Sequence, residues 1–127
     1  MSIFHYYNLP GAEFFVFDDF LICQVKEGME IQPGHNESLE EVIQKHFQGK
    51  NIGYISNRVK SYSVDPLIYV ETEKIPNLLA IAMIPETEIM RSNAEFEKNF
   101  YDKPYEIFDN LSNAIAWVHG IVKKANL

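Results

Sequence analysis

Cysteine and basic residues are both scarce in this sequence. Cys23 is the only cysteine among 127 residues, which excludes an intrachain disulfide and a thiolate metal cluster and favours a reduced, cytoplasmic setting. Eleven Lys and Arg residues stand against eighteen Asp and Glu residues, for a formal net charge of −7. Because nucleic acids and anionic membrane surfaces bind basic proteins, this charge argues against both as main partners.

Long apolar runs and recognisable catalytic motifs are also missing. No apolar run approaches the ~20 residues of a membrane-spanning helix, and the first residues lack the basic-then-apolar order of a signal peptide. The sequence has no Gly-x-Ser-x-Gly elbow and no glycine-rich phosphate-binding loop. Cys23 lies within an apolar stretch, where a small buried side chain is the usual role. We therefore expect a protein without catalytic activity and without a cofactor.

The four histidines do not predict a metal site. If one helix carried both His35 and His46, they would lie about 16 Å apart at 1.5 Å rise per residue. One zinc ion cannot bind two ligands at that separation. His5 and His119 stand near opposite ends of the sequence, so no two histidines have the spacing of metal ligands. We interpret His35 and His46 as the edge of an apolar helical stripe.

The patterns that are present alternate between strand and helix. With no internal repeat or linker, residues 1–127 are expected to form one domain. Apolar runs at 14–17 and 21–25 flank Asp18-Asp19, which predicts a tight turn and an antiparallel hairpin. Residues 3–7 are a candidate edge strand.

The middle of the sequence predicts parallel strands joined by helices. Leu39, Val42, Ile43 and Phe47 recur at helical spacing. Short apolar runs at 52–55 and 78–84 are typical of strands that are buried on both faces. Two parallel strands need a long, usually helical crossover, so we predict a helix over 66–74, starting at Asp65-Pro66, although residues 67–72 have strand propensity.

The last third continues the alternation. Ile89, Phe96 and Phe100 share a helical stripe that we expect to face the core. A short strand over 105–108 and an amphipathic helix from Leu111 to Val122 follow. Together these elements predict an α/β fold with four helices and a mixed, mostly parallel sheet that begins with an antiparallel hairpin.

Residues 104–118 carry a family resemblance. Their short strand, aspartate-type cap and Ala-x-x-Trp helix (Ala114 and Trp117) resemble the STAS-like, or SpoIIAA-like, proteins. These are relatives of the sulfate-transporter and anti-sigma-antagonist domain, and they share a fold with the CRAL-TRIO lipid-binding domains. Residues 53–58, followed by 61–66, are similar to uncharacterised bacterial members. The resemblance implies one STAS-like domain over residues 1–127.

The resemblance also implies a regulatory serine. In the anti-sigma antagonists, a serine at the start of the helix after the central strand is phosphorylated, and this controls partner binding. By position, Ser61 or Ser63 corresponds to it. This sequence has Ser-Tyr-Ser-Val-Asp-Pro there, in place of that family's Asp-Ser-Ser-Gly pattern.

The candidate site lies where the parallel strands end. In open α/β sheets, ligands bind outside the carboxyl ends of the strands, so the loops at 57–63, 85–87 and 109–110 should meet there. The first loop contains a candidate interaction or anion site, since its cations and hydroxyls stand next to a helix start. Its members are Asn57, Arg58, Lys60, Ser61 and Ser63. The alternative is that Asn57 and Ser63 satisfy loop backbone groups while Arg58 and Lys60 are solvated.

Two functions remain open. The first is a regulatory or protein-interaction module that acts through residues 57–65 and binds another protein or a second copy of itself. The second is a carrier of a small apolar or lipid-like ligand, by analogy with the CRAL-TRIO relatives, which predicts a sizeable apolar cavity. The aromatic residues Phe4, Tyr6, Tyr7 and Tyr62 are candidates for either a pocket or a dimer interface.

Overall fold

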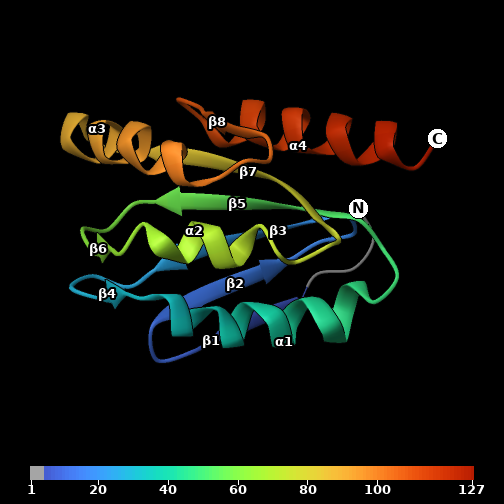
Figure 1. The fold of residues 1–127 in the computed structure, drawn as a ribbon, viewed down its shortest axis with the longest axis horizontal. Helices are drawn as coiled ribbons and strands as arrows, with labels where there is room; N and C mark the ends of the chain where they lie inside the picture. Colours follow the sequence, from blue (N-terminus) through green and yellow to red (C-terminus); the bar gives the residue numbers. More distant parts are fainter. Residues whose placement is uncertain (1–4) are drawn as a thin grey trace.

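The structure is a computed structural model that describes residues 5–127, and its elements follow the expected alternation (Figure 1). The strands are β1 (His5–Asn8), β2 (Ala12–Val16), β3 (Phe20–Val25), β4 (Glu30–Ile31), β5 (Ile52–Arg58), β6 (Ser63–Val64), β7 (Leu78–Pro85) and β8 (Tyr105–Ile107). The α-helices are α1 (Asn36–Phe47), α2 (Leu67–Thr72), α3 (Glu88–Glu97) and α4 (Leu111–Ala125). Short 3-10 turns, η1 (Pro33–His35) and η2 (Lys98–Phe100), precede α1 and follow α3.

The main sheet has six strands in the order β1-β2-β3-β5-β7-β8. The predicted hairpin is confirmed, because β2 pairs antiparallel with β3, and β1 is an antiparallel edge strand. Residues 3 and 4 of the predicted edge strand, including Phe4, lie outside the described residues. From β3 to β8 all pairs are parallel. The mixed α/β sheet is thus the one that the sequence predicts.

The order of the parallel strands decides which face each helix covers. Because β3, β5, β7 and β8 follow one another across the sheet as they do along the chain, right-handed crossovers place α1, α2 and α3 on the same face. That face has its own core cluster, to which Leu39, Ile68 and Ala94 contribute from the three helices. Only α4, after the last strand, covers the other face, through Ala114 and Val118. Figure 1 shows α1 and α2 on one side of the sheet and α4 on the other.

The predicted helices α1, α2 and α4 form as expected. The segment with strand propensity is helix α2, and the carboxylate of Asp65 accepts a hydrogen bond from the Leu67 N–H at 3.1 Å. Helix α1 ends before Gly49, whose φ of +76° is the left-handed conformation that glycine adopts easily. At α4, the Asn110 side chain accepts a hydrogen bond from the Asn113 N–H.

The predicted core stripe is wrong at Ile89 and Phe96, whereas Phe100, in η2 after α3, is partly buried against the core. Ile89 is 74% exposed and Phe96 is 58% exposed, whereas Ala94 and Glu97 are buried. The helix is turned so that a small residue packs on the sheet and a carboxylate enters the interior. Hydrophobic periodicity could not predict this orientation because it depends on a buried polar partner that lies far away in sequence.

A two-stranded parallel ladder was not predicted. Strands β4 and β6 pair through Glu30↔Ser63 and Ile31↔Val64, outside the main sheet. Each has two residues, which is too short to produce a recognisable sequence pattern. The ladder ties the loop after β5 to the loop after β3.

Helix α4 lies unusually close to the central strand β5. A Cβ atom added at Gly53 would stand 1.9 Å from Cγ1 of Val118, so this strand position accepts only glycine without a shift of the helix. Across residues 5–127, no helix combines the length and apolarity needed to cross a membrane.

We expect Gly53→Ala to lower the free energy of unfolding by about 1–3 kcal/mol, because the added methyl overpacks the contact with Val118. Urea denaturation measures the change. Gly120→Ala is the control, since position 120 lies in α4 with open space around it and should gain up to about 1 kcal/mol. Equal stability of Gly53→Ala and wild type would contradict the close approach.

Candidate functional site

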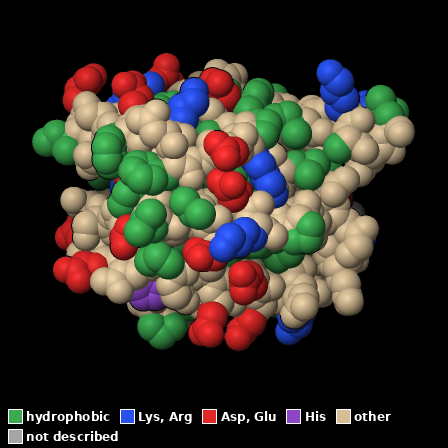
Figure 2. Space-filling model, in the orientation of Figure 1, with side chains coloured by type: hydrophobic (Ala, Val, Ile, Leu, Met, Phe, Trp, Pro, Cys, Tyr) green, Lys and Arg blue, Asp and Glu red, His purple; other side chains and the backbone are tan. Residues whose placement is uncertain are grey.

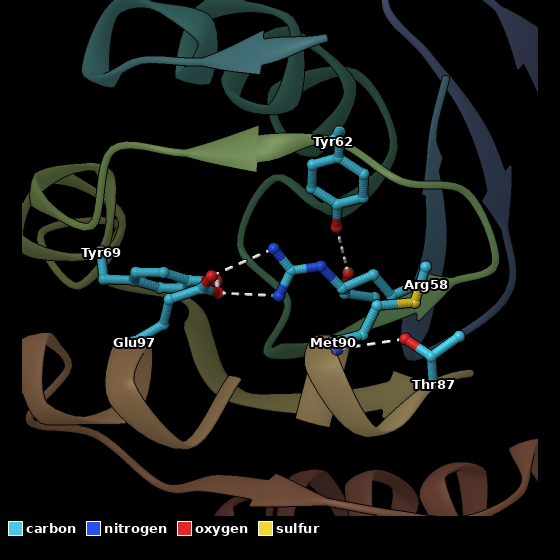
Figure 3. A network of polar contacts seen from close by, with 7 residues as sticks. Arg58, Tyr62, Tyr69, Thr87, Met90 and Glu97 are labelled. Atoms are coloured by element: carbon cyan, nitrogen blue, oxygen red, sulfur yellow. Dashed lines mark hydrogen bonds and ion pairs between the residues drawn. The ribbon is translucent and has the colours of Figure 1, made fainter. Parts of the chain in front are cut away.

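Arg58, at the carboxyl end of β5, is the largest fully buried side chain of the site and is only 2% exposed. Its two terminal nitrogens donate to the two carboxylate oxygens of Glu97 on α3, both at 3.0 Å (Figure 3). A bidentate guanidinium–carboxylate pair is among the strongest polar contacts in proteins. The pair therefore fastens α3 to the end of the central strand.

Tyrosines surround this ion pair. The Tyr69 hydroxyl, from α2, donates to Glu97 Oε1 at 2.7 Å, and the Arg58 guanidinium lies 4.6 Å from the centre of the Tyr62 ring. Burial alone lowers the pKa of Arg58, but Tyr62 and the Glu97 carboxylate outweigh it, so its pKa ends above the ordinary value. Arg58 is thus a permanent cation whose charge is neutralised by Glu97.

This geometry corrects one part of the predicted anion site. Arg58 is not available to an outside anion because both of its terminal nitrogens already bind Glu97. Lys60, Ser61 and Ser63 are exposed. The Ser61 carbonyl accepts a hydrogen bond from the Gly28 N–H at 2.8 Å, and the Ser63 N–H donates to the Met29 carbonyl at 3.0 Å. The loop is therefore held by its backbone, leaving an exposed cation and two exposed serines.

The other two predicted loops lie at the start of α3 and beside it. Thr87 caps α3 by accepting a hydrogen bond from the Met90 N–H at 3.2 Å (Figure 3). Arg91, on the first turns of α3, forms an ion pair with Asp109 in the loop after β8. Asn57 lies in β5 opposite Ile84, so it belongs to the sheet rather than to the loop.

A pocket of about 340 Å³ lies between the sheet and the first turns of α1, at the carboxyl end of β3, and we call it the α1 pocket. Its apolar lining comes from segments that are distant in sequence: Leu9, Phe14, Val25, Met29, Ile31 and Leu39. Within residues 5–127, no Lys, Arg, Asp or Glu lines it. The sequence did not predict this pocket because no single segment forms it.

The single cysteine lines the α1 pocket. Cys23 is 3% exposed, which agrees with its predicted role as a small buried side chain. Burial raises the pKa of its thiol to about 12, and it raises the pKa of the neighbouring Tyr54 well above the ordinary value. Both groups are therefore uncharged at neutral pH. His35, just before α1, is a further titratable side chain of the lining.

The structure brings two histidines together that the sequence keeps apart. The rings of His5 and His46 are centred 4.5 Å from each other, and His46 Nε2 lies 2.5 Å from the Tyr7 hydroxyl. Their spacing in the sequence did not predict this contact. Burial lowers the pKa of His46, and the adjacent His5 and Lys45 lower it further. In the described part of the chain, no group of three or more His, Cys, Asp or Glu side chains is arranged to hold a metal ion.

Exposed apolar side chains gather on a second surface, which we call the α2–α3 surface. It comprises Val59 in the loop after β5, Leu67 and Val70 on α2, and Ile89 and Phe96 on α3. Figure 2 shows apolar side chains gathered over these two helices. The surface lies next to the exposed loop that contains Lys60, Ser61 and Ser63.

Carboxylates surround the α2–α3 surface. Four exposed acidic residues lie on its segments: Asp65, Glu86, Glu88 and Glu95. Two cations of the same region are occupied, Arg91 by Asp109 and Lys98 by Glu106. Acidic side chains therefore predominate on the rim of this surface, beside the exposed Lys60 of the adjacent loop.

Comparison with known proteins identifies the fold. A solved structure of an uncharacterised protein of the DUF3478 family from Shewanella loihica PV-4, described as having a SpoIIAA-like fold, superposes with a TM-score of 0.53. The two sequences are 11% identical, and the match covers 91% of this chain and 92% of the other. The chain thus has the SpoIIAA-like fold that its sequence resembles. No protein-family model matches the sequence, and no curated protein is similar to it.

The burial of Glu97, the partner of Arg58, has one feature in the sequence that could have predicted it. Ala94, Glu97 and Tyr101 are spaced at helical intervals and are all buried. A stripe that starts from alanine is less apolar than the competing stripe of Ile89, Phe96 and Phe100. Choosing it requires knowing that an arginine lies opposite, and Arg58 is 39 residues away in sequence.

Replacing Arg58 by Met should lower the free energy of unfolding by about 3–5 kcal/mol, since it leaves the Glu97 carboxylate buried without a partner. The double variant Arg58→Met/Glu97→Leu should recover most of that loss, because neither charge then remains. Arg91→Met is the control. Its partner Asp109 is exposed, so the free energy of unfolding should fall by about 1 kcal/mol or less. Urea unfolding of the four proteins tests this, and equal losses at positions 58 and 91 would contradict it.

Proposed function

We propose that this protein binds a small apolar molecule in the α1 pocket and acts as a non-enzymatic, cytoplasmic carrier or ligand-responsive module. The observation that carries the proposal is the pocket itself, whose volume of about 340 Å³ lies within the range of about 300–1,000 Å³ that ligand sites occupy. A sizeable apolar cavity is what the carrier hypothesis requires.

The chemistry of the lining supports binding rather than catalysis. A nucleophilic cysteine needs a lowered pKa, whereas burial raises that of Cys23 to about 12. Its neighbour Tyr54 is likewise held neutral by burial. Within the described residues, a lining with no Lys, Arg, Asp or Glu favours an uncharged apolar ligand, because such a ligand loses no hydration of a charge on entering.

Ala12→Leu should weaken binding of 1-aminoanthracene, an apolar fluorescent probe that is uncharged at neutral pH. Ala12 lines the pocket from β2, and the larger side chain occupies space that the probe needs. Losing contact with two or three methylene groups lowers affinity about tenfold or more. Fluorescence titration measures the dissociation constant.

A control variant separates the loss of pocket space from a general effect of a larger side chain. Ala116→Leu is the matched control, since position 116 is exposed on α4 and does not line the pocket. The proposal fails if wild type does not bind the probe, or if Ala12→Leu binds it as wild type does.

A second candidate function is favoured by the α2–α3 surface. Its apolar side chains, acidic rim and position beside the 57–65 loop suit a protein-interaction module. The partner with matching chemistry is another protein that presents apolar side chains flanked by Lys and Arg, such as a basic amphipathic helix. Because a second copy of this chain would bring the same acidic rim, we favour another protein over self-association.

Phosphorylation of Ser61 or Ser63 stays a prediction within this second candidate. Both side chains are exposed at the edge of the α2–α3 surface. Since Arg58 is bound to Glu97, Lys60 is the cation of this loop that remains for a phosphate. A phosphate there would add to the acidic rim and strengthen the attraction for a basic partner.

A helical peptide of Leu and Lys arranged amphipathically should bind this protein, and Ile89→Ser/Phe96→Ser should weaken that binding about tenfold or more through lost apolar contact. Isothermal titration calorimetry measures the affinities. Leu127→Ser removes an exposed apolar side chain elsewhere and is the matched control. Binding that survives in the double variant, or equal binding of a Leu and Glu peptide, would contradict the assignment of this surface.

A further inference from the structure

A smaller recess of about 50 Å³ adjoins the α1 pocket, and we call it the inner recess. The two spaces share lining residues, among them Val25, Leu39 and Ile68, so they lie side by side. Since a water molecule occupies about 30 Å³ in the liquid, the recess has room for about one small chemical group.

Two hydroxyls in the inner recess form only a long hydrogen bond with each other. The Ser56 hydroxyl and the Tyr62 hydroxyl are 3.5 Å apart, at the outer limit of hydrogen bonding, and both residues line the recess. Ser56 is 4% exposed, so bulk solvent offers its hydroxyl little hydrogen bonding. The other polar pair in the wall is engaged: Asn36 donates to the Thr72 hydroxyl at 2.9 Å, and that hydroxyl donates to the Ile68 carbonyl.

Charge decides which group the recess accepts. No Lys, Arg, Asp or Glu of the described chain lines either space. Arg58 lies against the Tyr62 ring, but Glu97 neutralises its charge. A carboxylate or phosphate in the recess would lose its hydration without gaining a cation, which costs several kcal/mol.

We propose that the ligand is an uncharged amphiphile, an inference that rests on the proposed function of the α1 pocket. Its apolar part fills that pocket, and its single hydroxyl or carbonyl oxygen binds Ser56 and Tyr62 in the inner recess. Either hydroxyl can donate to such an oxygen. Burial raises the pKa of Tyr62 to about 12, so the donor proton is present throughout the neutral range. The Tyr62 ring is held in place by the cation–π contact with Arg58.

Three eight-carbon compounds test the ligand class by displacement of 1-aminoanthracene: 1-octanol, octanoate and octane. At pH 7.5, 1-octanol should bind at least about tenfold more tightly than octanoate, because the carboxylate finds no cation. Tighter binding of octanoate would overturn the proposal, since it would require a cation that the recess lacks.

Variants of the two hydroxyls test the recess directly. In Ser56→Ala/Tyr62→Phe, the affinity for 1-octanol should fall about three- to tenfold, as expected for one lost hydrogen bond, while octane binding stays unchanged. Phe at position 62 keeps the ring that lies against Arg58. Ser63→Ala is the control, because Ser63 lines neither space.

The outcomes separate the two proposals. If 1-octanol and octane both bind and the double variant binds both as wild type does, the α1 pocket is a ligand site and the inner recess has no role in recognition. If neither the fluorescent probe nor any of the three compounds binds wild type, the proposed function fails and the ligand class fails with it.

Discussion

The bidentate ion pair between Arg58 and Glu97 is the contact on which the carboxyl end of this sheet depends. It joins the end of β5 to α3, and through the Tyr69 hydroxyl it also joins α2. Because both charges are buried, neither residue can leave the other without a large cost. The pair therefore sets the rotation of α3 about its axis. With Glu97 turned inward, Ile89 and Phe96 must face outward, and the α2–α3 surface is a consequence of a polar contact in the interior.

The α1 pocket results from a different constraint, the small residues between β1 and β2. Gly11 has no space for a side chain, since a Cβ there would stand 2.7 Å from Cε of Met29. Ala12 follows it in the pocket wall. Small side chains here leave space between the sheet and the first turns of α1. The β4–β6 ladder holds Ile31, with Met29 just before it, in the pocket wall. Helix α2 is common to both features, because Ile68 lines the pocket while its neighbours Leu67 and Val70 are exposed.

The ion pair, the pocket and the α2–α3 surface differ in how much of each was visible in the sequence. The sequence predicts Arg58 as a member of an exposed anion site, because an arginine next to hydroxyls in a loop is usually solvated. It predicts Tyr62 as part of either a pocket or a dimer interface, and Tyr62 lines the inner recess. Ser56 and Cys23 lie on strands, where alternation predicts burial and nothing more. The pocket needs Leu9, Ile31 and Leu39 together, and their separation in sequence gives no local pattern to detect.

The sequence by itself determined the order of strands and helices, the antiparallel start of the sheet, the burial of Cys23 and the resemblance to SpoIIAA-like proteins. These follow from periodicity, turn residues and helix caps, which act over a few residues. Only the tertiary structure decided the rotation of α3, the apolar lining of the α1 pocket and the contact between the rings of His5 and His46. Each of these depends on side chains that are far apart in the chain. Their energies, the desolvation of a buried charge and the filling of space, exist only once the sheet and helices have come together.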